Sequence, residues 1–392
     1  MKIAYFHYHY DVAGGAMGAA VQIQALAQEL RRLGHDVAVQ AWGAGAAGAS
    51  KAPRQLKEIR WLRRYAHAPR LWLRNLSLYR REAAFLRAYQ PDVVLAVSSF
   101  GTIAPVWSTR RLGLPLVLFC EAPLVYEYSL FHTEFCPYGL LSAWLEGYAC
   151  RHASQVVCIS EILKGYLLRC GGPATKYWVV PNGADPESFC PRLPDEELQR
   201  QLDLAGRTVL GFVGTFQFIA DVSRFFRIIA EISRWRPEVA FLWVGRGAAA
   251  ADLRQAFADA GLLSACRFVG PIPHEQIPRY LSLMDVVWAP YRGDYLFYGS
   301  SMKMLEYMAA GKAVVATALG QIKELVHDGC NGLLYEPEDW PGLAVKLEAL
   351  LTDPDLRHRL GQEARQTILR GWTWQHQARR LAKVLAAAVA GP

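Results

Sequence analysis

The sequence lacks an apolar run long enough to span a membrane, and it has no Cys-x-x-Cys pair. Its eight cysteines are scattered, and Cys120, Cys158 and Cys266 stand inside apolar runs. This pattern predicts buried thiols in a reducing compartment and argues against a disulfide framework or a zinc site. Residues 1–6 resemble a first strand and not a secretory signal, so we expect a cytoplasmic protein.

A composition typical of disorder is also missing. Hydrophobic residues make up 52% of the chain and charged residues 20%, which is typical of a globular protein. A chain of 392 residues exceeds the size of one ordinary hydrophobic core. We therefore expect two domains.

Positive charge is concentrated in one segment, residues 51–82. The segment holds ten Lys or Arg against two Glu, and this excess of eight equals the net charge of the whole chain. Aromatic residues are interleaved with the charges: Trp61, Tyr65, Trp72 and Tyr79. Two interpretations stay open, namely helices with a solvated basic face and a peripheral contact with an anionic membrane. Nucleic acid is a poorer candidate because the segment carries no recognition motif.

The N-terminal region has the pattern of a βαβ unit, with strands at 2–7 and 37–40 and a helix at 16–33. The loop before the helix contains Gly14 and Gly15, but the full dinucleotide fingerprint is missing. No acidic residue follows the second strand, where a nicotinamide site needs one. The loop is therefore predicted to let the backbone approach a sugar or a phosphate.

Strands and helices alternate along the rest of the chain. Strands are predicted at 92–97, 116–120, 155–159, 209–213, 239–244, 267–269, 285–289, 313–316 and 332–334. Two helices at about 339–350 and 355–370 and a last amphipathic helix follow them. The turn-rich passage 179–185 indicates a crossing between domains. This order predicts two doubly wound α/β domains, with polar residues such as Glu121 and Glu127 just beyond a strand.

Residues 298–317 have the pattern of a loop, a helix, a turn and a strand. Ser300 or Ser301 is predicted to cap the helix, and Met302, Leu305 and 308–309 form its apolar face. Unpaired N–H groups and the positive end of the helix dipole suit a phosphate. Lys303 adds a positive charge there, and Glu306 lies one turn further along the same face. An ordinary amphipathic helix with two solvated charges is the alternative.

Five passages in this order resemble glycosyltransferase family 4, whose members have the GT-B fold. They are Val179–Asp185, Phe212–Gly214, Asp285–Pro290, Lys303–Ala316 and Asp328–Leu334. The resemblance implies two Rossmann-like domains facing across a cleft. It implies an acceptor domain at 1–183, joined by a C-terminal helix at about 374–392, and a nucleotide-sugar donor domain at 184–373. The family's reaction is hexosyl transfer from a nucleotide-diphosphate donor with retention at the anomeric carbon.

The resemblance also implies roles for individual residues. Glu306 matches the family glutamate that holds the ribose hydroxyls, and a carboxylate suits a vicinal diol because it accepts two O–H bonds. Ser300, Ser301 and Lys303 match the loop that faces the diphosphate, Gly14 and Gly15 match the glycines that allow close approach, and Ile272 falls where the family packs the base. Gly214 and Gly299 are also expected among the donor-binding residues.

The chain departs from the family pattern at several positions. Tyr298 stands where the family usually has a second glutamate that contacts the donor sugar. Thr215 follows Gly214, and the usual Arg and Lys after this strand are missing, so Arg246 or Arg292 is expected to help meet the diphosphate charge. The first-domain histidine is also absent, which leaves Glu121 or Glu127 to orient the acceptor hydroxyl.

Three functions follow from these matches and departures. The first is a retaining transferase that moves a sugar from UDP or GDP to a lipid-linked or polysaccharide acceptor at the cytoplasmic membrane face. The second is a transferase for a soluble small molecule, and the third is a catalytically silent nucleotide-sugar-binding partner. No cofactor and no obligatory metal are expected. Asp353-Pro354-Asp355 spells a metal-binding string, but its position between two helices favours helix stop and start signals.

Overall fold

The computed structural model describes residues 1–8, 18–42, 60–131, 139–215, 222–247 and 249–391. The chain forms two compact units: unit 1 is Met1–Pro181 with Gln377–Pro392, and unit 2 is Asn182–His376. The sequence-based prediction set these boundaries at 183/184 and 373/374. Among the described helices, none is both long and apolar enough to cross a membrane.

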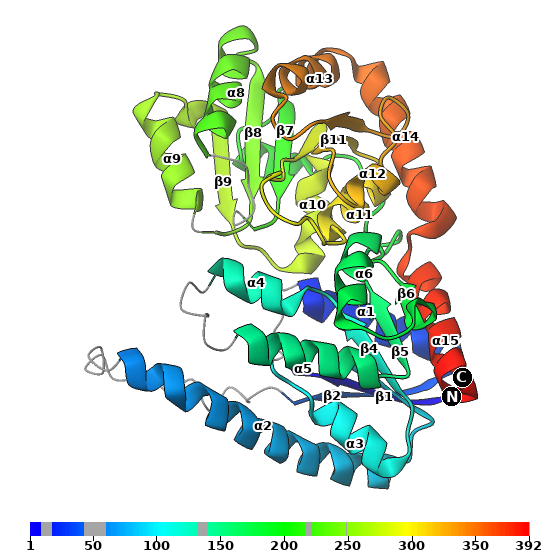
Figure 1. The fold of residues 1–392 in the computed structure, drawn as a ribbon. Helices are drawn as coiled ribbons and strands as arrows, with labels where there is room; N and C mark the ends of the chain where they lie inside the picture. The colour runs from blue at the N-terminus through cyan, green and yellow to red at the C-terminus, as the bar shows by residue number, and fades with distance from the viewer. Residues whose placement is uncertain (9–17, 43–59, 132–138, 216–221, 248, 392) are drawn as a thin grey trace. The chain divides into compact units, whose positions relative to one another are not determined.

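Unit 1 is built on a six-stranded parallel sheet with the order β2-β1-β3-β4-β5-β6 (Figure 1). Its strands are β1 Lys2–His7, β2 Asp36–Ala41, β3 Val93–Val97, β4 Leu116–Cys120, β5 Gln155–Cys158 and β6 Tyr177–Val179. Its helices are α1 Gly18–Arg32, α2 Arg60–Tyr89, α3 Ala104–Leu112, α4 Leu124–Phe131, α5 Gly139–His152 and α6 Glu161–Leu167. Two short 3-10 helices, Leu168–Cys170 and Ala174–Lys176, precede β6.

The central strands of unit 1 are apolar because both faces of the sheet are covered. Every residue of β3 and β4 is buried, as expected for a parallel sheet between two helix layers. The strands pair in a regular parallel register, for example Tyr5 opposite Leu95. The cysteines Cys120 and Cys158 face each other at the ends of β4 and β5 and are buried free thiols.

Two polar side chains of α2 fix it to α3. Asn75 Oδ1 accepts the N–H groups of Ile103 and Ala104 at 2.8 and 3.0 Å, and Asn75 Nδ2 donates to the carbonyl of Gly101 at 2.8 Å. These bonds satisfy the first N–H groups of α3, whose own N-cap residue supplies no side-chain bond. Glu82 is buried and accepts hydrogen bonds from Ser108 at 2.8 Å and Tyr8 at 2.9 Å.

Unit 2 has a second six-stranded parallel sheet, with the order β12-β11-β10-β7-β8-β9. Its strands are β7 Thr208–Val213, β8 Val239–Val244, β9 Cys266–Gly270, β10 Val286–Ala289, β11 Ala313–Thr317 and β12 Leu333–Tyr335. Its helices are α7 Glu196–Gln201, α8 Val222–Trp235, α9 Ala249–Asp259, α10 Ile277–Ser282, α11 Met302–Ala309, α12 Ile322–Leu325, α13 Trp340–Thr352 and α14 Pro354–Gly371. The 3-10 helices Leu263–Ala265 and His274–Gln276 flank β9, and α15 Trp374–Ala390 ends the chain and continues into unit 1.

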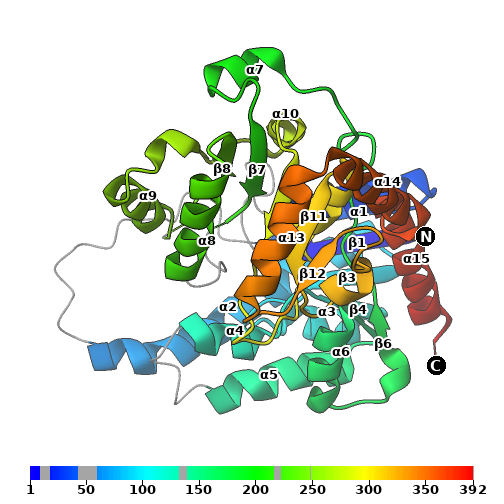
Figure 2. The same cartoon turned by 90° about the horizontal axis from the view of Figure 1, so that it is seen from above.

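Two hydrophobic cores cover the two faces of this sheet. Residues of α8, α9 and α13 pack on one face, and residues of α10, α11, α12 and α14 pack on the other. Figure 2 shows α8, α9 and α13, the helices of the first face, from above. The arrangement is that of a doubly wound domain, so both units are Rossmann-like and the predicted fold class is confirmed.

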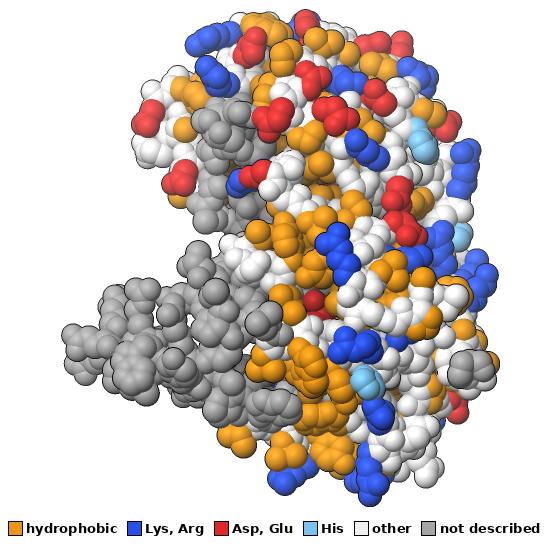
Figure 3. Space-filling view, in the orientation of Figure 1, with side chains coloured by type: hydrophobic (Ala, Val, Ile, Leu, Met, Phe, Trp, Pro, Cys, Tyr) orange, Lys and Arg blue, Asp and Glu red, His pale blue; other side chains and the backbone are white. Residues whose placement is uncertain are grey.

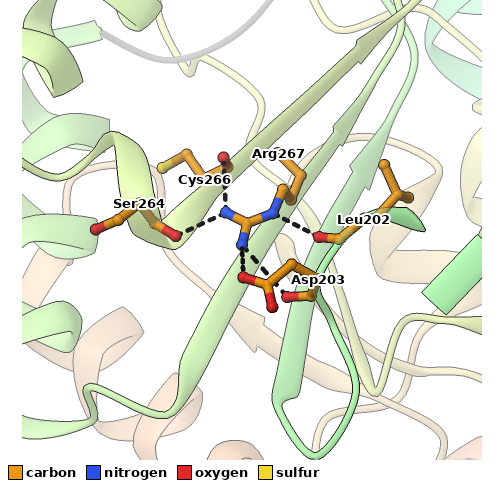
Figure 4. A network of polar contacts seen from close by, with 5 residues as sticks. All are labelled: Leu202, Asp203, Ser264, Cys266 and Arg267. Carbon is orange, nitrogen blue, oxygen red and sulfur yellow. Dashed lines mark hydrogen bonds and ion pairs between the residues drawn. The ribbon is translucent and has the colours of Figure 1, made fainter. Parts of the chain in front are cut away.

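Arg267 on β9 closes the turn that leads into β7 (Figure 4). Its guanidinium group donates to the carbonyls of Leu202 and Ser264 and forms an ion pair with the carboxylate of Asp203. Asp203 has a φ of +50°, in the left-handed region that ordinary residues rarely adopt. The five-donor fork of arginine is suited to holding such a turn.

The structure adds two details to the sequence-based prediction. Residues 124–131 form helix α4, which the sequence-based prediction did not include, and Glu127 lies in its first turn. In helix α11 burial extends beyond the predicted apolar face: residues 304–309 are all buried, Glu306 among them, whereas Met302 is only half-buried. The reason is that α11 lies between the sheet and α14, so every side of its second half meets protein.

Candidate functional site

The sheet of unit 2 reverses its strand order between β7 and β10, and this position defines the site. In open parallel sheets, ligands bind beyond the carboxyl ends of the strands at such a reversal. Here β7 ends at Val213 and is followed by Gly214, and β10 ends at Ala289 and leads into the loop before α11. The loop after β10 leads to the amino end of α11, so the position of this helix end relative to β7 and β10 determines the geometry of the site.

Two hydroxyl groups hold α11 in place. Ser301 is the N-cap, and its side chain accepts the N–H of Met304 at 3.4 Å. The hydroxyl of Tyr307 accepts the N–H of Val213 at 2.7 Å and donates to its carbonyl at 3.0 Å. Tyr307 is fully buried, so α11 is fixed to the end of β7 by hydrogen bonds that water does not reach.

The ammonium group of Lys303 lies against two aromatic rings at the strand ends. Its Nζ is 4.4 Å from the ring centre of Phe212 and 5.2 Å from that of Tyr291. Burial lowers the pKa of Lys303 to about 8, although the charge of Glu306 opposes the shift. Lys303 forms no ion pair with any acidic residue that the structure describes. A cation in this position, in the first turn of a helix, favours an anionic ligand.

Two glycines, which directly follow β7 and β8, make room for this arrangement. A Cβ atom on Gly214 would lie 2.9 Å from Lys303 Nζ, and one on Gly245 would lie 1.9 Å from the carbonyl oxygen of Gly214. Both glycines have positive φ, at +141° and +137°. Side chains at these positions would therefore close the space beside Lys303.

Glu306 is held by a histidine that the sequence-based prediction did not include. His274 Nε2 is 2.7 Å from Glu306 Oε1, and the glutamate side chain is only 9% exposed. His274 follows β9 by four residues, and Ile272, predicted near the base, lies half-buried two residues before it. No short sequence pattern marks His274, because its partner lies 32 residues away along the chain.

The loop before α11 is tied to the protein at each predicted serine. Ser300 is buried, accepts the N–H of Asn182 at 2.9 Å and receives the side-chain amide of Asn182 on its carbonyl at 2.8 Å. Ser301 Oγ is 2.6 Å from the hydroxyl of Tyr291. Tyr298 and Gly299 are half-buried, and a Cβ on Gly299 would meet nothing within 4 Å. These residues lie within the same loop as the α11 N-terminus.

The two arginines expected to help with the diphosphate differ in their surroundings. Arg246 is exposed and directly follows Gly245 at the end of β8. Arg292 forms an ion pair with Asp294 two residues away, so much of its charge is already balanced. Arg246 is the better placed of the two to supply additional positive charge.

Glu121 and Glu127 belong to unit 1. Glu121 directly follows β4, and its buried Oε1 has no hydrogen-bond partner among the described residues. Burial, and secondarily the charge of Glu127, raise the pKa of Glu121 to about 7. The hydroxyl of Tyr5, in the middle of β1, is likewise buried without a described partner and feels the charge of Glu121. Gly14 and Gly15 lie outside the described residues.

Among the residues that the structure describes, no group of three His, Cys, Asp or Glu side chains is arranged to hold a metal ion. Asp353 instead caps helix α14 by accepting the N–H of Leu356 at 2.9 Å.

Comparison with known proteins places both units in glycosyltransferase families. The family described as "Glycosyltransferase Family 4" matches residues 16–188, and "Glycosyl transferases group 1" matches residues 207–353. The alpha-D-kanosaminyltransferase of Streptomyces kanamyceticus is 27% identical over 76% of this chain and 77% of its own length.

Solved structures show the same fold over almost the whole chain. Sucrose-phosphate synthase from Thermosynechococcus elongatus aligns with a TM-score of 0.74 at 20% identity, covering 97% of each chain. The Anabaena protein HepE in complex with UDP aligns with a TM-score of 0.70 at 19% identity, covering 98% of this chain and all of the other. The two family matches and the two Rossmann-like units show that this chain belongs to the family 4 glycosyltransferases with the GT-B fold.

Proposed function

We propose that this glycosyltransferase moves a hexose from a nucleotide-diphosphate donor to an acceptor hydroxyl with retention at the anomeric carbon. The observation that carries the proposal is Lys303, a cation without an acidic partner among the described residues at the amino end of α11. A diphosphate there would balance the positive charge of Lys303. Lys303 would in turn stabilise the negative charge on the nucleoside diphosphate as it leaves. The structure of HepE with UDP supports a nucleotide of this class as donor.

Glu306 completes the donor site on the same helix. It lies one turn beyond Lys303, so a nucleotide whose phosphates meet Lys303 can place its ribose over Glu306. The carboxylate accepts hydrogen bonds from the vicinal hydroxyls of the ribose. Ile272 offers an apolar contact to the base, and Glu121 in unit 1 is the group proposed to orient the acceptor hydroxyl.

A calorimetric titration tests the donor site. UDP, GDP and their common sugar conjugates are titrated into the wild type, Lys303→Ala and Glu306→Ala, with Lys323→Ala as the matched control. Lys323 is exposed on α12 and pairs with Glu336. One nucleotide is expected to bind the wild type and the control alike and to bind the two site variants at least tenfold more weakly. If the wild type binds no nucleotide, the transferase proposal is overturned.

We further propose that the acceptor is lipid-linked or polymeric and that unit 1 contacts the inner membrane face. Unit 1 carries 23 Lys and Arg against 11 Asp and Glu, a net charge of +12, whereas unit 2 carries 20 against 24, a net charge of −4. Opposite net charges would present only unit 1 to an anionic surface.

The described surface of unit 1 adds a groove to the basic segment predicted from sequence. Three helices line it: Leu76 and Tyr79 on α2, Trp107, Arg110 and Arg111 on α3, and Tyr148 on α5. Next to it Trp144 is 50% exposed and stacks on Tyr148, and Leu73 is 67% exposed. Figure 3 shows hydrophobic and basic side chains side by side on this face of unit 1. Aromatic and aliphatic side chains beside arginines suit a headgroup region.

Vesicle sedimentation tests this contact. The wild type is expected to bind phosphatidylcholine vesicles that contain phosphatidylglycerol and not pure phosphatidylcholine vesicles. Arg110→Glu with Arg111→Glu should weaken binding roughly tenfold or more, since each basic residue near the surface contributes about 1 kcal/mol. Arg234→Glu with Trp235→Ser, an equally exposed pair on α8 of unit 2, is the control. Equal loss in both double variants, or no binding by the wild type, would favour the soluble acceptor.

The catalytically silent partner is the remaining alternative, favoured by Tyr298 where the family usually has a glutamate. A protein of this kind would bind the nucleotide-sugar but release no nucleoside diphosphate over hours in the presence of membrane and lipid extracts. Release that requires Glu306 would exclude it.

A further inference from the structure

His274 and Glu306 form a contact between two separate elements of unit 2. His274 begins the 3-10 helix His274–Gln276, and Glu306 lies in the middle of α11. Their Nε2 and Oε1 atoms are 2.7 Å apart, and both side chains are largely covered, at 29% and 9% exposure. Glu306 Oε2 accepts no hydrogen bond from any residue that the structure describes. One oxygen is thus engaged and the other is left available.

Packing fixes the imidazole ring on its other side. The ring of His274 lies 5.4 Å from that of Phe189 at an angle of 52°. Phe189 is 2% exposed and belongs to the hydrophobic core that also contains Leu305. An aromatic ring held by core packing and by a hydrogen bond has few alternative positions. The position of Glu306 Oε1 is therefore determined by the core as well as by its own helix.

The acidic groups around the pair raise the pKa of His274. Among described residues, the charged groups that act on the pair are Glu275 next to His274 and Lys303 on α11. Burial lowers the pKa of His274, but the hydrogen bond and charge of Glu306, with Glu275, outweigh it, so the pKa is raised overall. Both the neutral and the protonated imidazole can donate from Nε2. The contact thus persists through the titration of His274.

We propose that His274 is a positioning residue for donor binding, which holds one oxygen of Glu306 so that the carboxylate faces the ribose hydroxyls of the nucleotide. This inference rests on the proposed function of Glu306. Each carboxylate oxygen has two lone pairs, so Oε1 can accept from His274 and from one ribose hydroxyl together. Without His274, Glu306 loses the hydrogen bond that fixes its orientation.

The pairing itself is tested without a nucleotide. The pKa of the His274 imidazole is measured by NMR titration in the full-length wild type and in Glu306→Gln. The pKa is expected to fall in the variant, because a neutral amide no longer stabilises the imidazolium. His358, exposed on α14, should titrate identically in both proteins. An unchanged His274 pKa overturns the proposal.

The positioning role is tested by measuring whether the loss of His274 changes the contribution of the ribose hydroxyls to nucleotide affinity. The dissociation constants of UDP and 2′,3′-dideoxy-UDP, or of the corresponding pair for the nucleotide that binds, are compared in the wild type, His274→Ala, His274→Gln and His358→Ala. Loss of the diol should weaken binding roughly tenfold in the wild type and the His358→Ala control, and only about twofold in His274→Ala. His274→Gln should restore most of the difference, because its amide can donate to Glu306.

Failure of this inference is distinguishable from failure of the donor-site proposal. If Glu306→Ala abolishes the preference for the diol but His274→Ala does not change it, His274 has no positioning role and the donor site stands. If Glu306→Ala also leaves the preference unchanged, the ribose assignment of Glu306 is wrong, and the role of His274 is overturned with it.

Discussion

At the residue scale, the pKa of Lys303 makes a prediction about nucleotide binding. Burial lowers this pKa to about 8, so the amine is charged before binding at pH 7 and largely neutral at pH 9. Because a diphosphate binds the charged form of Lys303, binding above pH 8 requires Lys303 to take up a proton. The dissociation constant of the nucleoside diphosphate is therefore expected to rise about fivefold between pH 8 and pH 9, as the charged fraction of Lys303 falls.

The measurement is a titration at pH 7, 8 and 9 with the wild type and Lys303→Met. The variant should bind more weakly at every pH and show little change above pH 8. The parent nucleoside, which has no phosphates, is the control ligand and should bind with the same affinity at all three values. A wild-type affinity that does not change between pH 7 and pH 9 contradicts the role of Lys303.

The sequence was sufficient to predict some residues of this site and not others. Lys303, Glu306 and Gly214 stand in passages that resemble the family, so motif and spacing identified them. His274 and Tyr307 could not be found in this way, because their roles depend on partners 32 and 94 residues distant. A hydrogen bond between remote elements leaves no periodic trace in the sequence. Such contacts became visible only with the fold.

At the element scale, strand boundaries were predicted well where the buried apolar run is continuous. The predicted bounds of β4 and β8 agree with the structure, because an apolar run between turn residues is an unambiguous strand signal. The short helix α4 was missed, since its eight residues give too little periodicity. For the basic segment the sequence left helices with a solvated face and a membrane contact open as interpretations. The described part of the segment, from Arg60, lies in one helix of 30 residues, α2, despite Pro69.

The attachment of α2 to α3 gives a prediction at this scale. Asn75→Ala removes the acceptor of two N–H groups and the donor to one carbonyl, all at the start of α3. Leaving buried backbone groups unsatisfied should cost about 2–3 kcal/mol. Urea unfolding followed by circular dichroism should show the loss as an earlier transition. Ser77→Ala, at an exposed position on the same helix, is the control and should leave the transition in place.

At the scale of the whole molecule, the two units differ in how their stability depends on pH. Unit 1 contains three buried or largely covered carboxyl groups, Glu82, Glu121 and Glu146, and burial raises the pKa of each to about 7. In unit 2, ion pairs with arginine lower the pKa of Asp195 and Asp294. A raised carboxyl pKa means that the folded unit binds protons that the unfolded chain has already released. A lowered pKa has the opposite effect.

Unit 1 is therefore expected to lose stability as the pH rises from about 5 to about 7. In this window the unfolded carboxyls are ionised, while the folded ones must give up a proton in a medium that disfavours their charge. Glu82→Gln should reduce this loss, because its amide keeps the shape without the charge. Hydrogen exchange at pH 5 and pH 7, corrected for the intrinsic exchange rate, would locate the change in β1, α2 and α3. Glu161→Gln, at an exposed position on α6, is the control. Equal pH dependence in the wild type and Glu82→Gln would mean that Glu82 is ionised in the folded protein, and the polar contacts with Tyr8 and Ser108 would then have to stabilise a buried charge.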